Sequence, residues 1–198
     1  GFADIGYGST LDITSCPGTD TCNLGIASST GLARELENTL RNEFPAYAYN
    51  KDISIKLSGC MNACGQHSIA QIGFYGMSIK KGALVIPAFQ VLLGGGSMGN
   101  GKGRFADKVI KIPSKRGPEA LRLIIHDYEN NKNNDISFTD YYLEKEKTHF
   151  YNLLKPLADI SEVDKDIFID WGHNEAYIKA IGVGECAGVV IDLVSTLL

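Results

Sequence analysis

The sequence predicts an α+β protein of α/β-like character, in which a mixed β-sheet is flanked by helices. Short apolar stretches, several alternating with polar residues, indicate strands at 9–15, 52–58, 69–75, 83–93 and 108–113. Apolar residues at helical spacing indicate helices at 28–44, 118–131 and 137–157. A chain of 198 residues can build one sizeable core, or one domain with an appended piece.

Local signals support these elements in chain order. The helix at 28–44 has a capping residue among Ser28, Ser29 and Thr30, and its leucines recur every four residues. A hairpin turn through Lys80, Lys81 and Gly82 joins the strands at 69–75 and 83–93. Pro118 suits the first position of the next helix, because that position needs no backbone N–H.

The composition changes near residue 144, where the charged run EKEK begins. We therefore predict a main domain over 1–143 and a C-terminal extension, mostly helical, over 144–198. The extension contains a polar and aromatic cluster, DWGHNE, for which an interface is one interpretation. It ends in an apolar stretch, AGVVIDLVSTLL, that suits a core or interface helix and is too short to span a membrane.

Charge and hydropathy exclude several classes of partner. The formal net charge is −4 and no long basic run occurs, so nucleic acid and anionic membranes are not expected partners. The sequence contains no apolar run long enough to cross a bilayer, and GFADIGYGST lacks the pattern of a signal peptide. We expect a cytoplasmic protein.

Four of the five cysteines form two pairs, Cys16 with Cys22 and Cys60 with Cys64. Each pair follows a predicted strand directly, so two adjacent strands would place all four thiols at one end of a sheet. Four thiolates can hold zinc or an iron–sulfur cluster, and the wide first spacing favours the cluster. Buried or disulfide-paired cysteines remain the plain alternative. The fifth, Cys186, suits a small buried apolar residue.

The two segments TSCPGTDTCNLGIA and LSGCMNACGQHSIAQIGFYG resemble the sirohaem and 4Fe–4S motif of the nitrite and sulfite reductases, a likeness that covers roughly residues 5–143. The resemblance implies the fold of that sirohaem domain, and a cluster bound by all four paired cysteines. It implies that Cys64 also bridges to the sirohaem iron, and that Asn62, Gly65 and Gln66 contact the cofactors. For His67, a contact to a sirohaem carboxylate and a structural role both stay open.

The glycine-rich stretch GGGSMGNGKG contains a literal GxGxxG and nearly matches a phosphate-binding loop, in which Gly103 stands where Ser or Thr is needed. Both patterns also need a helix to begin at the loop. The next predicted element is a strand, so we reject a nucleotide site. The resemblance implies instead that the loop approaches the macrocycle, where Lys102 and Arg104 could pair with its carboxylates. A solvated loop is an equal alternative.

Enzymes of this family are longer and have two similar halves, and the basic residues that grip the substrate come largely from before the cysteine motif. We therefore expect a C-terminal portion of such a reductase, inactive alone, in which no catalytic residue can be assigned and either cofactor could be absent. Its expected partners are the N-terminal half, an electron donor such as ferredoxin or a flavoprotein, nitrite or sulfite, and a second copy in a homo-oligomer. The alternatives are a non-catalytic iron–sulfur or zinc module for electron transfer or assembly, and a metal-free scaffold.

Overall fold

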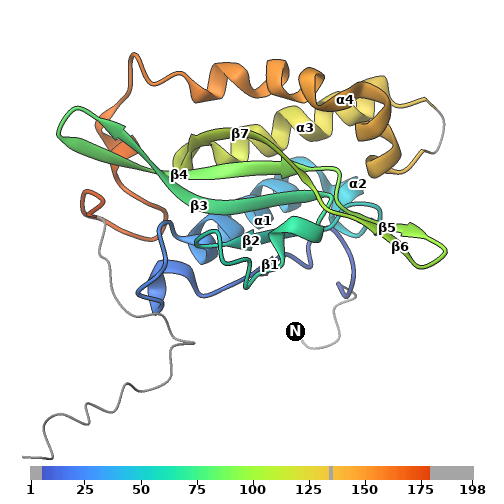
Figure 1. The fold of residues 1–198 in the computed structure, drawn as a ribbon, viewed down its shortest axis with the longest axis horizontal. Helices are drawn as coiled ribbons and strands as arrows, with labels where there is room; N and C mark the ends of the chain where they lie inside the picture. Colours follow the sequence, from blue (N-terminus) through green and yellow to red (C-terminus); the bar gives the residue numbers. More distant parts are fainter. Residues whose placement is uncertain (1–5, 134–135, 179–198) are drawn as a thin grey trace, which may run out of the picture.

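The computed structural model describes residues 6–133 and 136–178, and its centre is a five-stranded mixed sheet of order β1-β2-β3-β4-β7 (Figure 1). β1, β2 and β3 are parallel, whereas β4 pairs antiparallel with β3 and with β7. The strands are β1 Thr14–Ser15, β2 Ile55–Ser58, β3 Ile72–Lys81, β4 Leu84–Leu93 and β7 Asp107–Pro113. The predicted mixed sheet is confirmed.

Helices cover one face of this sheet (Figure 1). α1 packs on α3 and on the first two strands, and α4 packs on α3 and β7. The α-helices are α1 Ser29–Glu43, α2 Pro45–Ala48, α3 Gly117–Asn131 and α4 Phe138–Leu154. Short 3-10 turns complete the described part: Gly18–Asp20, His67–Ile69, Ser114–Arg116, Lys155–Ala158 and Lys165–Phe168.

The core lies between the sheet and these helices. Side chains alternate between the two faces of a strand, so every second residue faces the helices. Residues opposite each other on neighbouring strands share a face, as in the pairs Phe74–Val91 and Phe89–Ile112. On the helix side, the leucine stripe of α1 is completely buried. α1 begins where expected, since the Ser28 hydroxyl accepts the Gly31 N–H at 3.1 Å.

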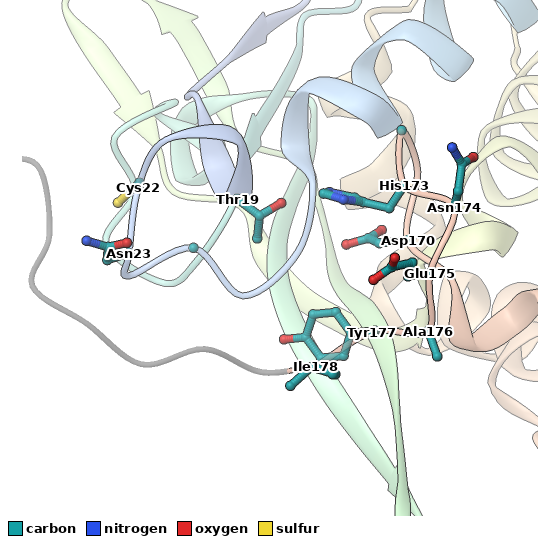
Figure 2. Close-up of a pocket in the computed structure, with 12 residues that line it drawn as sticks. Thr19, Cys22, Asn23, Asp170, His173, Asn174, Glu175, Ala176, Tyr177 and Ile178 are labelled. Atoms are coloured by element: carbon teal, nitrogen blue, oxygen red, sulfur yellow. The ribbon is translucent and has the colours of Figure 1, made fainter.

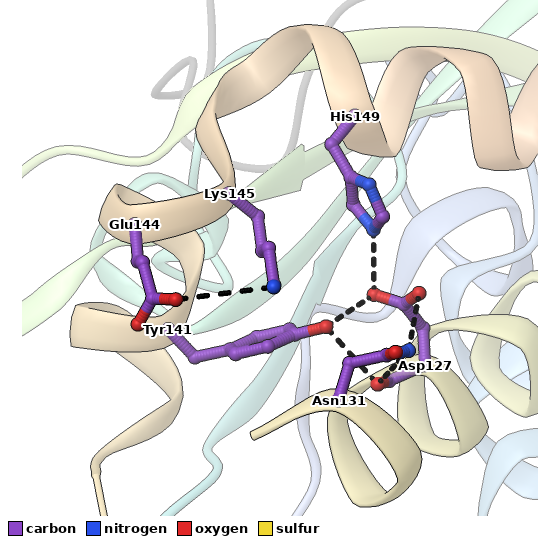
Figure 3. A network of polar contacts seen from close by, with 6 residues as sticks. All are labelled: Asp127, Asn131, Tyr141, Glu144, Lys145 and His149. Carbon is purple, nitrogen blue, oxygen red and sulfur yellow. Dashed lines mark hydrogen bonds and ion pairs between the residues drawn. The ribbon is translucent and has the colours of Figure 1, made fainter. Parts of the chain in front are cut away.

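α3 and α4 are joined by a polar network around Asp127 (Figure 3). The Tyr141 hydroxyl donates to the Asp127 carboxylate at 2.7 Å, and His149 Nε2 lies 2.8 Å from the same oxygen. Glu146, between these two partners on α4, has a left-handed φ of 65°, so the helix is kinked there. The network therefore ties both halves of a kinked helix to α3.

Several sequence-based expectations change in detail. β1 has only two residues, because the preceding segment forms turns in which Ser9 bonds to Gly6 and Asp12 bonds to Ser9. The glycine-rich stretch forms a separate two-stranded ribbon, β5 Gly96–Gly99 with β6 Lys102–Arg104. β7 follows this ribbon.

The C-terminal part follows the prediction only as far as it is described. α4 runs across the expected boundary at 143/144, and the division into two domains stays a prediction. After α4 the described residues form two 3-10 turns and an isolated bridge between Ile169 and Ala176. Cys186 and the expected apolar helix at the C-terminus lie outside the described residues. Across 6–133 and 136–178, no helix is long and apolar enough to cross a membrane.

Candidate metal centre

The two cysteine loops leave the same edge of the sheet. β1 and β2 are adjacent and parallel, with Ser15 opposite Leu57, so their carboxyl ends point the same way. Cys16 follows Ser15 directly, and Cys60 comes two residues after Ser58. The topology thus brings together the two loops that carry the paired cysteines, as expected from their positions after neighbouring strands.

Gly59 holds the two loops together through its backbone. Its N–H donates to Cys16 Sγ at 3.0 Å, and its carbonyl accepts the N–H groups of Ile26 at 2.7 Å and Ala27 at 3.1 Å. A Cβ at Gly59 would lie 2.5 Å from the Cα of Gly18 in the first loop. Only glycine at position 59 permits this close approach of the two loops.

The four cysteines differ in exposure, and none of them is in a disulfide. Cys16 and Cys22 are half-buried, Cys60 is buried and Cys64 is exposed. Among the described residues, no three His, Cys, Asp or Glu side chains are close enough to hold a single metal ion. The four thiol donors and the backbone donor to Cys16 suit a thiolate-bound cluster.

Ser58, the last residue of β2, organises the second loop after Cys64. Its hydroxyl accepts the Gly65 N–H at 3.0 Å and lies 2.8 Å from His67 Nδ1. A Cβ at Gly65 would overlap the Leu57 carbonyl oxygen. The loop therefore folds back on β2 through Gly65 and His67.

His67 is 4% exposed, and its ring lies beside Tyr75 with a centroid distance of 4.9 Å. Burial, together with the nearby Lys108 charge, lowers the pKa of His67 to about 4. The imidazole is then neutral at neutral pH and does not attract an anion by charge. These contacts favour the structural role that the sequence left open.

We expect His67 to make folding stability depend on pH. Its folded pKa is depressed below the unfolded value, so the unfolded chain binds more protons between about pH 6.5 and pH 4. This contribution to stability is complete above about pH 6.5, and about 3 kcal/mol of it is lost as the pH falls to about 4. Urea unfolding at about pH 7 and about pH 4.5 should show a smaller loss for His67→Gln than for the wild type. Equal losses in both proteins would contradict this assignment.

The residues expected to face a macrocycle divide into two groups. Asn62, Gln66 and Lys102 are exposed, although the Gln66 side-chain oxygen accepts from Lys56 Nζ at 3.1 Å. Arg104 is engaged within the domain, where it forms an ion pair with Asp107 and donates to the Gly94 carbonyl at 2.8 Å. Asn62 and Lys102 are therefore exposed to a ligand, whereas Gln66 and Arg104 would first have to give up bonds within the domain.

A cavity of about 550 Å³ lies beside the first cysteine loop (Figure 2). One wall carries Thr19, Cys22 and Asn23, and the opposite wall is the segment from Asp170 to Ile178. Sequence reasoning did not place this cavity, although the DWGHNE cluster was the signal that could have pointed to it. No periodic pattern connects that cluster with residues about 150 positions earlier.

The family model described as the nitrite and sulphite reductase 4Fe-4S domain matches residues 7–153. The chain belongs to this family. An NADPH sulfite reductase hemoprotein beta-component from Buchnera aphidicola subsp. Acyrthosiphon pisum is 26% identical over 138 residues, which cover 67% of this chain. An assimilatory ferredoxin-dependent nitrite reductase from Haloferax mediterranei is 29% identical over 82 residues, or 41% of this chain. The resemblance seen in the cysteine segments is confirmed.

Solved structures of the family share the fold. The NirA protein of Mycobacterium tuberculosis superposes with a TM-score of 0.60 at 23% identity, over 72% of this chain and 27% of that one. A dissimilatory sulfite reductase I superposes with a TM-score of 0.57 at 9% identity, over 84% and 59%. This chain spans only 22% of the length of the Buchnera relative and 14% of the Haloferax one.

Proposed function

We propose that Cys16, Cys22, Cys60 and Cys64 bind a 4Fe–4S cluster, and that the chain is the C-terminal cofactor-binding portion of a sirohaem-dependent nitrite or sulfite reductase. The observation that carries the proposal is the Gly59 N–H, which belongs to the second cysteine loop and donates to Cys16 Sγ of the first. Backbone donors to sulfur ligands tune iron–sulfur clusters. The family match to a 4Fe-4S domain supports this use of the cysteines.

The exposure and the hydrogen bonds of each loop residue support one role for it. Cys64 is the exposed member of the set, which suits a thiolate that also bridges to the sirohaem iron. Asn62, Gln66 and Lys102 are exposed and would contact the macrocycle or its carboxylates. Gly65 and His67 hold the loop shape through Ser58. Arg104 would serve the macrocycle only if it exchanged Asp107 for a sirohaem carboxylate.

The cluster and sirohaem, when bound, would store electrons and hold the substrate for the six-electron reduction of nitrite to ammonia or of sulfite to sulfide. The rest of the reductase would supply the other half of the pocket. Relatives named for NADPH and for ferredoxin support a flavoprotein or ferredoxin as electron donor. The homo-oligomer and the cytoplasmic location stay predictions.

The decisive test is the iron and acid-labile sulfide content of anaerobically purified protein, with its absorption spectrum. We expect about four iron atoms and four sulfides per chain. Serine at Cys16, Cys22, Cys60 or Cys64 should each lower the iron content at least about tenfold, because a cluster needs all four thiolates. Added tetrapyrrole bands would support sirohaem binding by this portion.

Cys186→Ser is the matched control, since it removes a thiol that lies outside the two loops in sequence, and it should leave the iron content unchanged. Stoichiometric zinc, or iron that survives each of the four substitutions, would overturn the proposal. A cluster without tetrapyrrole bands, even after sirohaem is added to the chain together with the remaining part of the reductase, would favour the non-catalytic module.

A further inference from the structure

Residues 170–177, here called the C-terminal clamp, lie against the peptide that follows Cys22 (Figure 2). The clamp lies beyond residue 153, where the family match ends. Three of its side chains bond to residues more than fifty positions earlier, in both the α1 and α3 regions. The clamp is therefore packed on the domain next to the first cysteine loop.

Asp170 anchors the clamp at the start of α1. Its carboxylate is 2% exposed and accepts the Ser28 N–H and the Ser114 hydroxyl, both at 2.7 Å. Ser28 is the residue that caps α1, so the buried charge lies at the positive end of the helix dipole. A buried carboxylate with these bonds fixes the position of Ser28 strongly.

Trp171, the next residue of the clamp, contacts both the segment before α3 and the first turn of α1. Its indole N–H donates to the Ser114 carbonyl at 2.9 Å, and Lys115 Nζ lies 3.9 Å from its ring centroid. A Cβ at Gly31 would lie 2.6 Å from the Trp171 Cβ. Glycine in the first turn of α1 is thus what permits the clamp to approach so closely.

Tyr177 reaches the cysteine loop itself. Its hydroxyl donates to the Ile26 carbonyl at 2.6 Å, while the Ile26 N–H donates to the Gly59 carbonyl at 2.7 Å. The Ile26 backbone is therefore bonded through its N–H to the second cysteine loop and through its carbonyl to the clamp. Burial and the Asp170 charge raise the pKa of Tyr177 to about 12, so its hydroxyl stays a donor at neutral pH.

We infer that Asp170 and Tyr177 are positioning residues for the candidate metal centre: they hold Ser28 and Ile26 so that the loop bearing Cys16 and Cys22 is fixed against the loop bearing Cys60 and Cys64. The inference rests on the proposed function only for the identity of the group that the two loops bind. The clamp itself acts on the chain before any cofactor is present.

The test is amide hydrogen exchange on the cofactor-free chain, together with the alkylation rate of Cys22. Tyr177→Phe removes one hydrogen bond and should speed exchange at Ile26 and Ala27 about fivefold. Asp170→Asn removes a charge-assisted acceptor and should speed it about tenfold or more. Alkylation of Cys22 should accelerate in parallel. Tyr151→Phe, at a half-exposed tyrosine on α4, is the matched control and should change neither rate.

A loosened loop must be distinguished from a protein that is merely less stable. Exchange in the middle of α3 should stay unchanged in Tyr177→Phe, because the clamp acts locally. Unchanged loop exchange in both variants, or equal acceleration in the loop and α3, would overturn the inference. If the wild type takes up no iron, the proposed function fails, whereas the exchange data still decide on the clamp. If it does take up iron, Tyr177→Phe should lose it to a chelator severalfold faster than Tyr151→Phe.

Discussion

Alanine at Gly59 is expected to separate the two cysteine loops and to prevent cluster assembly. The new Cβ would lie 2.5 Å from the Gly18 Cα and 3.0 Å from the Ala27 carbonyl oxygen, and both are backbone atoms that cannot rotate away. Overpacking of this kind typically costs about 1–3 kcal/mol, and we expect the upper end here because two loops must move. Urea unfolding and iron content measure the two consequences.

Gly103→Ala is the matched control for Gly59→Ala. The nearest atom to a Cβ at Gly103 is the Gly96 carbonyl oxygen at 3.7 Å, an ordinary contact. This variant should keep its iron and lose at most about 0.5 kcal/mol of unfolding free energy. If Gly59→Ala behaved like Gly103→Ala in both measurements, the close approach of the loops would not matter for the centre.

Alanine at Phe150 should cost about 3–5 kcal/mol of unfolding free energy. Phe150 is completely buried on α4, and its ring packs on Tyr142 at 5.2 Å and on Tyr141 at 6.0 Å between centroids. The same helix residue falls within the extension that the sequence predicted from 144 onward. Thermal or urea unfolding of the variant therefore also tests whether that part belongs to the main core.

Tyr151→Ala provides the comparison, because Tyr151 is the next residue on α4 and is 42% exposed. A surface change of this kind should shift the unfolding free energy by no more than about 0.5 kcal/mol. A similar small loss for Phe150→Ala would mean that the region after 143 folds apart from the main domain. A separate early unfolding transition would mean the same.

The sheet and its helices were largely predictable, because their signals are local. The alternation at 52–58, the hairpin through Gly82 and the leucine stripe after Ser28 each depend on neighbours a few residues apart. The length of β1 was overestimated for the same reason. The residues at 9–15 suit a strand, but the turn bonds of Ser9 and Asp12 take up its first residues, so the strand begins only at Thr14. Local propensity does not register such competing bonds.

The candidate site was predictable in composition but not in its contacts. The cysteine spacing and the resemblance indicated which side chains to group. The engagement of Arg104 with Asp107 and the burial of His67 beside Ser58 came only from the folded chain. The sequence does not show whether a polar residue in a loop already forms an ion pair or a hydrogen bond within the protein.

The sequence by itself determined the kind of chemistry: two cysteine pairs after two strands, with glycines and other small residues between them, in a chain of the nitrite and sulphite reductase family. Only the tertiary structure decided that the Gly59 N–H bonds to Cys16 and that the Tyr177 hydroxyl bonds to the Ile26 carbonyl. The physical reason is distance along the chain. Contacts across 43 and 151 residues depend on how the whole core packs, and no local pattern encodes them.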